Sequence, residues 1–186
     1  GEIESLGDPK DWYMEHKWDG IRSQNIFRED QIFIWSRGEE LVTDKYPEFH
    51  DLIGLIPNGT VIDAEILAFP DNQIGTFNDL QTRIGRKIIS NALLKKTPVI
   101  LKAYDVLEWE GKDIRSTPFI ERRTLLDQLF ASIDSNLPLQ LSPVLPFDEF
   151  DELKILREAS SGNIPLSSDV MMVYGGQDEL MSPKLA

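Results

Sequence analysis

The 186-residue chain has no cysteine and no long apolar run. Without cysteine it can form no disulfide, no thiolate nucleophile and no cysteine-based zinc site. No apolar stretch approaches the ~20 residues that a membrane-spanning helix needs. The first residues, Gly-Glu-Ile-Glu-Ser-Leu-Gly-Asp, also lack the basic and apolar regions of a signal peptide. We therefore expect a soluble, intracellular protein that contacts no membrane.

Basic side chains are scarce as well. The chain carries 19 Lys and Arg against 32 Asp and Glu, which gives a formal net charge of −13. Because binding to phosphates is driven by Lys and Arg, the composition by itself argues against a nucleic-acid-binding protein. The charge is unevenly placed, however, and residues 147–186 hold 8 acidic and 3 basic side chains, a net of −5. A local basic run suited to a phosphate backbone is formed by Arg83, Arg86, Lys87, Lys95 and Lys96.

The strands predicted from the apolar pattern favour an α+β fold with antiparallel sheets flanked by helices. Residues 23–35 alternate around Glu29-Asp30, as in a β-hairpin. Residues 60–69 and 98–109 form two further strands, and residues 170–174 a short one.

Helices are predicted between and after these strands. Thr117 before Pro118 is typical of a helix start, with a hydroxyl cap and proline at the first helical position, and apolar residues continue at helical spacing to Leu129. Two further helices are expected at residues 88–95 and 147–159.

The strand at residues 60–69 has two unlike faces. Ile62, Ala64, Ile66 and Ala68 share one apolar face that should pack inward. The other face places Asp63 and Glu65 side by side on an otherwise apolar strand. Two neighbouring carboxylates are costly there unless they bind something, although a solvated strand face is the plainer alternative.

A lysine stands at the centre of the most informative segment. Residues 15–22 read Glu-His-Lys-Trp-Asp-Gly-Ile-Arg. Lysine is a useful covalent nucleophile only when deprotonated, and its unperturbed pKa is ~10.4. Partial burial beside other cations lowers that pKa, and Lys17 is flanked by Trp18 and followed by Arg22. The alternative is a surface lysine in a turn, since Asp-Gly is a common turn dipeptide.

The motif Lys-x-Asp-Gly-x-Arg at residues 17–22 resembles the nucleotide-binding motif of the covalent nucleotidyltransferases, which are DNA ligases, RNA ligases and mRNA capping enzymes. Five further stretches, in a consistent order, make the chain most similar to the adenylation domain of a bacterial ATP-dependent DNA ligase. The resemblance implies an ATP-grasp-like nucleotidyltransferase fold. The five stretches are residues 35–40, 63–65, 80–87, 104–107 and 108–115.

The resemblance also implies roles for individual residues. Lys17 matches the lysine that attacks the α-phosphate of ATP and forms a lysyl-AMP phosphoramidate. Glu15 matches the residue that recognises the adenine amino group, for which a carboxylate acceptor is suitable. Tyr104 matches the aromatic side chain that stacks on the base.

Three charged residues match positions near the sugar and phosphates. Arg22 and Arg37 match arginines near the ribose, the phosphate and the DNA 5′-phosphate, where a planar fork of donors is favoured. Glu65 matches the strand carboxylate near the ribose and the divalent metal, with Asp63 as its possible partner. The implied cofactors are ATP and Mg²⁺ or Mn²⁺, and the implied partner is nicked double-stranded DNA. The resemblance further implies a monomer in the bacterial cytoplasm with nucleoid-associated activity.

The chain departs from the family after residue 163. We expect residues 1–163 to form the adenylation domain and residues 164–186 the start of an oligonucleotide-binding (OB) domain, with segments missing after residues 163 and 174. A late glutamate and late lysines of the family are not found there. A DNA ligase is the leading interpretation. An RNA ligase, a capping-type enzyme, and a non-catalytic nucleotide- or DNA-end-binding relative stay as alternatives.

Overall fold

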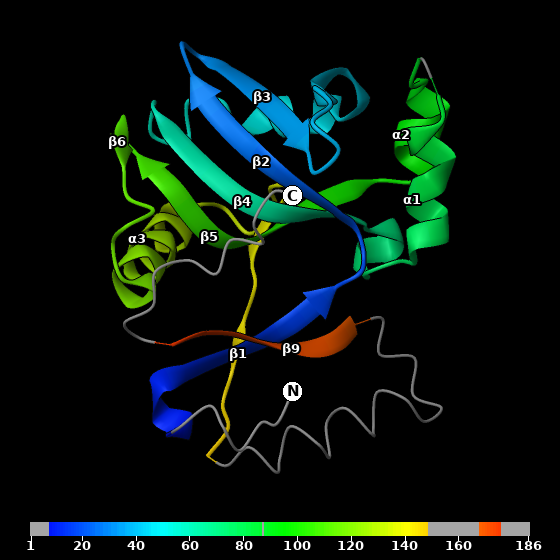
Figure 1. Cartoon of the computed structure of the whole chain (residues 1–186). Helices are drawn as coiled ribbons and strands as arrows, with labels where there is room; N and C mark the ends of the chain where they lie inside the picture. The colour runs from blue at the N-terminus through cyan, green and yellow to red at the C-terminus, as the bar shows by residue number, and fades with distance from the viewer. Residues whose placement is uncertain (1–7, 87, 149–167, 176–186) are drawn as a thin grey trace.

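The computed structural model describes residues 8–86 and 88–148 and the backbone of a strand at residues 168–175. Two sheets form its framework, one large and one small (Figure 1). The large sheet has the order β3-β2-β4-β5-β6, with β7 parallel to β5, and all its other pairings are antiparallel. The small sheet has the order β8-β1-β9 and is antiparallel. The strands are β1 (Trp12–Trp18), β2 (Ile21–Arg28), β3 (Gln31–Ser36), β4 (Thr60–Ala68), β5 (Val99–Trp109), β6 (Lys112–Asp113), β7 (Leu139–Leu141), β8 (Val144–Leu145) and β9 (Ser168–Gly175).

The three long strands expected from the sequence are all present in the large sheet. The hairpin β2–β3 turns at Glu29 and Asp30, whose φ angles of 53° and 54° give the twist that a two-residue hairpin needs. Strand β4 lies between β2 and β5. Its inward face is the predicted one, because Ile62, Ala64 and Ile66 are fully buried in the main hydrophobic core.

Helices pack against strands β4 and β5 of the large sheet (Figure 1). The expected helix near residue 88 is the six-residue α2, capped by Ser90, whose side chain accepts from the N–H of Leu93. The helix after Thr117 begins later than predicted: Pro118 is its N-cap residue and no side chain caps it. None of the helices in the described ranges is long and apolar enough to cross a membrane. The α-helices are α1 (Phe77–Ile84), α2 (Asn91–Lys96) and α3 (Phe119–Ser132), and the 3₁₀ helices are Pro9–Asp11, Thr43–Lys45, Pro47–Leu52 and Pro70–Asn72.

The chain crosses between the two sheets twice. Strand β1 belongs to the small sheet and passes through Asp19 and Gly20 directly into β2 of the large sheet. Later, β7 lies on β5 and is followed by Ser142, after which β8 pairs with β1 (Figure 1). Residues that precede or follow these crossings are therefore brought close to both sheets.

The C-terminal expectations are only partly within the described residues. The predicted strand at residues 170–174 is present as β9, and its backbone pairs with β1 from Trp12 to Trp18. The predicted helix at residues 147–159 falls almost entirely outside the described residues, as does the junction after residue 163. The OB-domain assignment of residues 164–186 stays a prediction.

Candidate nucleotide site

Lys17 lies near the end of β1, immediately before the first crossing between the sheets. Its side chain is exposed. The expectation of partial burial beside Arg22 is therefore wrong: two residues of turn separate the strands, and the Arg22 guanidinium is bound to a carboxylate.

Gly20 allows the crossing to lie close against β4. A Cβ atom at this position would lie 2.2 Å from the carbonyl oxygen of Ile66, which is far inside the contact distance of any real side chain. The Gly20 N–H donates to Oε1 of Glu65 over 3.1 Å. The Asp-Gly dipeptide after Lys17 is thus explained by packing as well as by turn propensity.

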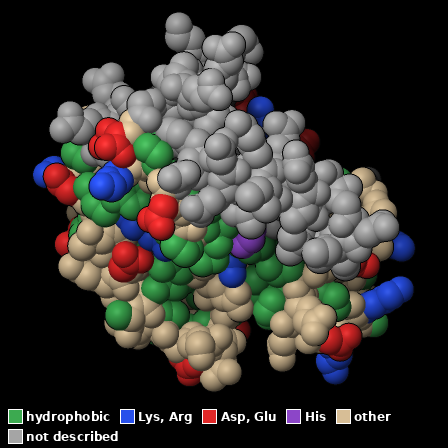
Figure 2. All heavy atoms as spheres, turned by 90° about the horizontal axis from the view of Figure 1, so that it is seen from below, with side chains coloured by type: hydrophobic (Ala, Val, Ile, Leu, Met, Phe, Trp, Pro, Cys, Tyr) green, Lys and Arg blue, Asp and Glu red, His purple; other side chains and the backbone are tan. Residues whose placement is uncertain are grey.

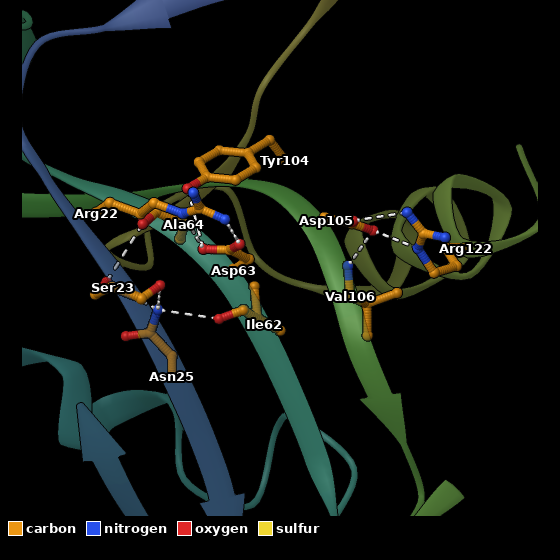
Figure 3. A network of polar contacts seen from close by, with 10 residues as sticks. All are labelled: Arg22, Ser23, Asn25, Ile62, Asp63, Ala64, Tyr104, Asp105, Val106 and Arg122. Carbon is orange, nitrogen blue, oxygen red and sulfur yellow. Dashed lines mark hydrogen bonds and ion pairs between the residues drawn. The ribbon is translucent and has the colours of Figure 1, made fainter. Parts of the chain in front are cut away.

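Arg22, Asp63 and Tyr104 form one network on the large sheet (Figure 3). Arg22 donates to both oxygens of Asp63, over 3.2 and 2.6 Å, and the Tyr104 hydroxyl donates to Oδ1 over 3.0 Å. A β-bulge positions the tyrosine, since Ala64 pairs with Ala103 and Asp63 with Asp105. The bulge leaves Tyr104 as the extra residue on β5 and aims its side chain at Asp63. The carboxylates of β4 are therefore not a simple solvated face.

Glu65 follows Asp63 on the same face of β4 and is partly buried. Burial raises the pKa of Glu65 to about 7, the hydrogen bond from Gly20 opposes the rise, and the negative charge of Asp63 adds to it. Arg22 is the register partner of Glu65 on β2. Arg22 and Glu65 thus lie across from each other beside the turn that follows Lys17.

The backbone of Arg37 contacts the backbone of Arg22. It follows β3, and its N–H donates to the carbonyl oxygen of Arg22 over 3.1 Å. Its side chain is exposed. A role for this guanidinium toward phosphate stays a prediction.

Glu15 has a partner that the sequence reasoning missed. It is buried on β1, and Nη1 of Arg123 on α3 donates to its Oε1 over 2.9 Å. The two residues are 108 positions apart, and local periodicity gives no signal for such a contact. The Glu-Arg-Arg run in α3 was present in the sequence, but its register toward β1 depends on the tertiary structure.

Lys102 is a second residue that sequence reasoning missed. It stands on β5 opposite Glu65, yet its Nζ donates to Oε1 of Gln140 over 3.0 Å and lies 5.0 Å from the centre of the Trp18 ring. Burial lowers the pKa of Lys102. Its ammonium lowers the pKa of His16 in turn, after the larger effect of the histidine's own burial.

The expected basic run is only partly described, because Lys87 lies outside the described residues, and one of its members is not available to phosphate. Arg83 is fully buried and donates to Glu48 over 2.5 and 2.9 Å and to the carbonyl oxygen of Thr97 over 3.0 Å. It is a structural residue, so its inclusion in the run was wrong. Arg86 and Lys95 are exposed. On the face shown in Figure 2, acidic and basic side chains are interspersed rather than gathered by sign.

Glu65 is the candidate metal ligand of this site. Among the residues that the structure describes, no three His, Asp or Glu side chains gather closely enough to hold a metal ion by themselves. Mg²⁺ commonly uses one or two carboxylates together with substrate phosphates. Glu65 fits the part of such a single carboxylate ligand.

Comparisons with known proteins agree with this geometry. The family model described as "ATP dependent DNA ligase domain" matches residues 3–161. A probable DNA ligase of Koribacter versatilis is 36% identical over 118 residues, which cover 63% of this chain and 20% of that protein. The chain therefore spans about a fifth of the length of this curated relative.

Solved structures show the same fold. The mycobacterial DNA ligase D complexed with ATP and MES has a TM-score of 0.65 and 23% identity, over 91% of this chain and 50% of that chain. The ligase domain of M. tuberculosis LigD has a TM-score of 0.68 and 22% identity, over 95% and 52%. With the family model covering most of its length, the chain belongs to the ATP-dependent DNA ligase domain family.

Proposed function

We propose that the chain is the nucleotidyltransferase part of an ATP-dependent DNA ligase, with Lys17 as its covalent nucleophile. One observation carries the proposal. Lys17 is exposed on β1, three residues before Gly20, whose N–H donates to Glu65, and Arg22 follows the same turn at the start of β2. These neighbouring positions along the crossing support the proposal. An amine, a carboxylate and a guanidinium around one turn suit transfer of a nucleotidyl group from a triphosphate.

In the proposed reaction the Lys17 ammonium first loses a proton. Its nitrogen lone pair then forms a bond to the α-phosphorus of ATP, while the bond from that phosphorus to the bridging oxygen breaks and pyrophosphate leaves. The AMP group next passes to the 5′-phosphate at a nick in DNA. The neighbouring 3′-hydroxyl finally attacks that phosphate and releases AMP, which closes the strand.

The other side chains of the site bind and orient the nucleotide. Tyr104 keeps its hydroxyl on Asp63 and is only partly buried, which supports a role in stacking on the adenine. Glu15 is the acceptor for the adenine amino group, and Arg22 and Arg37 are donors toward ribose and phosphate. Glu65 would hold Mg²⁺, which neutralises negative charge on the phosphates when bound.

A single substitution tests the nucleophile. Lys17→Ala, incubated with α-labelled ATP and Mg²⁺, is expected to retain no covalent label after denaturing electrophoresis, because no amine remains to form the phosphoramidate. Lys112→Ala, which changes an exposed lysine of β6, is the matched control and should label like the unchanged chain. Covalent label on Lys17→Ala would overturn the assignment.

The substrate is tested with the same label. We expect ATP rather than GTP to modify Lys17, and nicked DNA rather than nicked RNA to be sealed. Preference for GTP would favour a capping-type enzyme, and preference for nicked RNA an RNA ligase. Nucleotide binding without covalent label would favour the non-catalytic relative. A monomeric state and a location at the nucleoid stay predictions.

A further inference from the structure

Glu15 and Lys17 share one face of β1, two residues apart. The carboxyl group of Glu15 is almost entirely buried, with a side-chain exposure of 5%. It contacts the guanidinium of Arg123, whose side chain is 8% exposed. A buried carboxyl group two residues from the nucleophile is well placed to read the base of a nucleotide whose α-phosphate lies at Lys17.

Arg123 is itself held in a fixed orientation. While Nη1 donates to Glu15, Nη2 donates to the carbonyl oxygen of Ser142 over 2.8 Å, and Nε donates to Asp127 over 3.1 Å. The Ser142 hydroxyl in turn accepts from Nε1 of Trp18 over 3.0 Å. The second crossing between the sheets, at Ser142, thus supports the arginine that contacts Glu15.

The charge on Glu15 depends on this contact. Burial raises the pKa of Glu15 to about 7, and Ser142 and Arg123 oppose the rise. Asp105 on β5 and Asp127 on α3 are the acidic groups that face it, and both raise the pKa further. Among these charged neighbours, Arg123 supplies the positive charge that favours the ionised form of Glu15.

The ionisation state decides which base edge Glu15 can bind. An ionised carboxylate only accepts hydrogen bonds, so it pairs with the 6-amino group of adenine. A protonated carboxyl group donates, so it pairs with the 6-oxo group of hypoxanthine or guanine. We propose that Arg123 determines the base specificity of the nucleotide site, by holding Glu15 as an acceptor that selects 6-aminopurine over 6-oxopurine nucleotides. This inference rests on the proposed adenylation of Lys17 and on base recognition by Glu15.

The test compares covalent labelling of the full chain by α-labelled ATP and α-labelled ITP between pH 6 and 9. In the unchanged chain we expect ATP to label faster than ITP at pH 7. In Arg123→Met the rate ratio of ATP to ITP should fall by at least about tenfold at pH 7, the effect of one hydrogen bond to a charged group. The ratio should recover as the pH rises, because without the arginine Glu15 ionises only at higher pH. Arg115→Met, which removes an exposed arginine paired with Asp113, should leave the ratio unchanged.

The possible failures can be told apart. Absence of label on the unchanged chain would refute the proposed function. In Glu15→Gln an amide replaces the carboxylate and both donates and accepts, so the ratio should fall at every pH; an unchanged ratio would refute base recognition by Glu15. A reduced ratio in Glu15→Gln together with an unchanged, pH-independent ratio in Arg123→Met would overturn the role of Arg123.

A conservative variant covers the case in which Arg123→Met does not fold, as judged by circular dichroism. Arg123→Lys keeps the positive charge but loses the fork that binds Glu15 and Ser142 together. We expect an intermediate ratio with its pH dependence moved to higher pH. A ratio in Arg123→Lys identical to that of the unchanged chain at every pH would overturn the proposal.

Discussion

Asp63 organises more of the site than any other single carboxylate in the described residues. It is 2% exposed, and it holds the Arg22 fork and the Tyr104 hydroxyl at the same time. The sequence reasoning gave it only a possible role beside Glu65. The structure makes it the residue on which two nucleotide-binding candidates depend.

Removal of this carboxylate provides a prediction at the residue scale. Asp63→Ala should lower the free energy of unfolding by about 1–3 kcal/mol, because the Tyr104 hydroxyl and the partly buried Arg22 lose their acceptor. Urea denaturation measures the change. Asp113→Ala removes an ion pair whose side chains are 56% and 64% exposed and screened by solvent, so it should cost much less than Asp63→Ala. Equal losses in the two variants would contradict the buried network.

Individual residues differ in how far the sequence could predict them. Lys17, Arg22 and Glu65 were identified because they stand in short motifs at fixed spacing. The structure pairs Arg22 with Glu65 beside the turn that follows Lys17. The environment of Lys17 was predicted wrongly, since exposure depends on how β1 meets β2. Arg123 and Lys102 were missed because their partners lie on other elements, far away in the chain.

At the scale of elements, the crossing from β1 to β2 depends on the absence of a side chain at Gly20. The amide of Gly20 contacts Glu65, and its α-carbon faces the backbone of Ile66. Strand β4 therefore supports the nucleophile's strand as well as carrying two carboxylates.

Addition of a methyl group at position 20 tests this close approach. Gly20→Ala should destabilise the fold by about 1–3 kcal/mol, because the added Cβ meets a backbone oxygen that cannot move freely. It should also reduce labelling of Lys17, because the turn must shift away from Glu65. Thermal unfolding and α-labelled ATP measure the two effects.

Gly85→Ala is the matched control for this change. Gly85 has open space around its Cβ position and a φ of −74°, so alanine should be neutral or stabilise the protein by up to about 1 kcal/mol. A Gly20→Ala protein as stable and as active as the Gly85→Ala protein would refute the close approach of the crossing to β4.

Strands were predicted better than helix ends. The alternation of β4 marks its core face without further information, and the structure confirms it at Ile62, Ala64 and Ile66. The bulge at Tyr104 has no such signal, because it arises from the pairing of β5 with β4. The start of α3 was misplaced because Thr117 and Pro118 satisfy a local capping rule that the tertiary structure does not use.

At the scale of the whole molecule, the net charge of −13 opposes binding to the phosphates of DNA. The basic run is interrupted by the burial of Arg83 in an ion pair with Glu48. Arg83 is therefore not available to replace a counterion of a DNA backbone, and acidic side chains outnumber basic ones in the whole chain.

Weak DNA binding is the resulting prediction. At ~150 mM salt the chain should bind a nicked duplex with a Kd weaker than about 1 µM, in the range of non-specific complexes. Fluorescence anisotropy of a labelled nicked duplex measures it, and the slope of log Kd against log salt should be shallow. Submicromolar binding with a steep slope would contradict this prediction and would show that the chain has a phosphate-binding face.

The crossing at Gly20 also has a mechanical consequence. If the two sheets rotate against each other, Gly20 is the natural pivot, and displacement grows with distance from it. Lys17 stands three residues away, within about 10 Å, so a rotation of about 10° moves its α-carbon by less than about 2 Å. Trp12, at the other end of the same strand, travels more than twice as far. In such a rotation, Lys17 would occupy the part of β1 that keeps its position relative to Glu65 best.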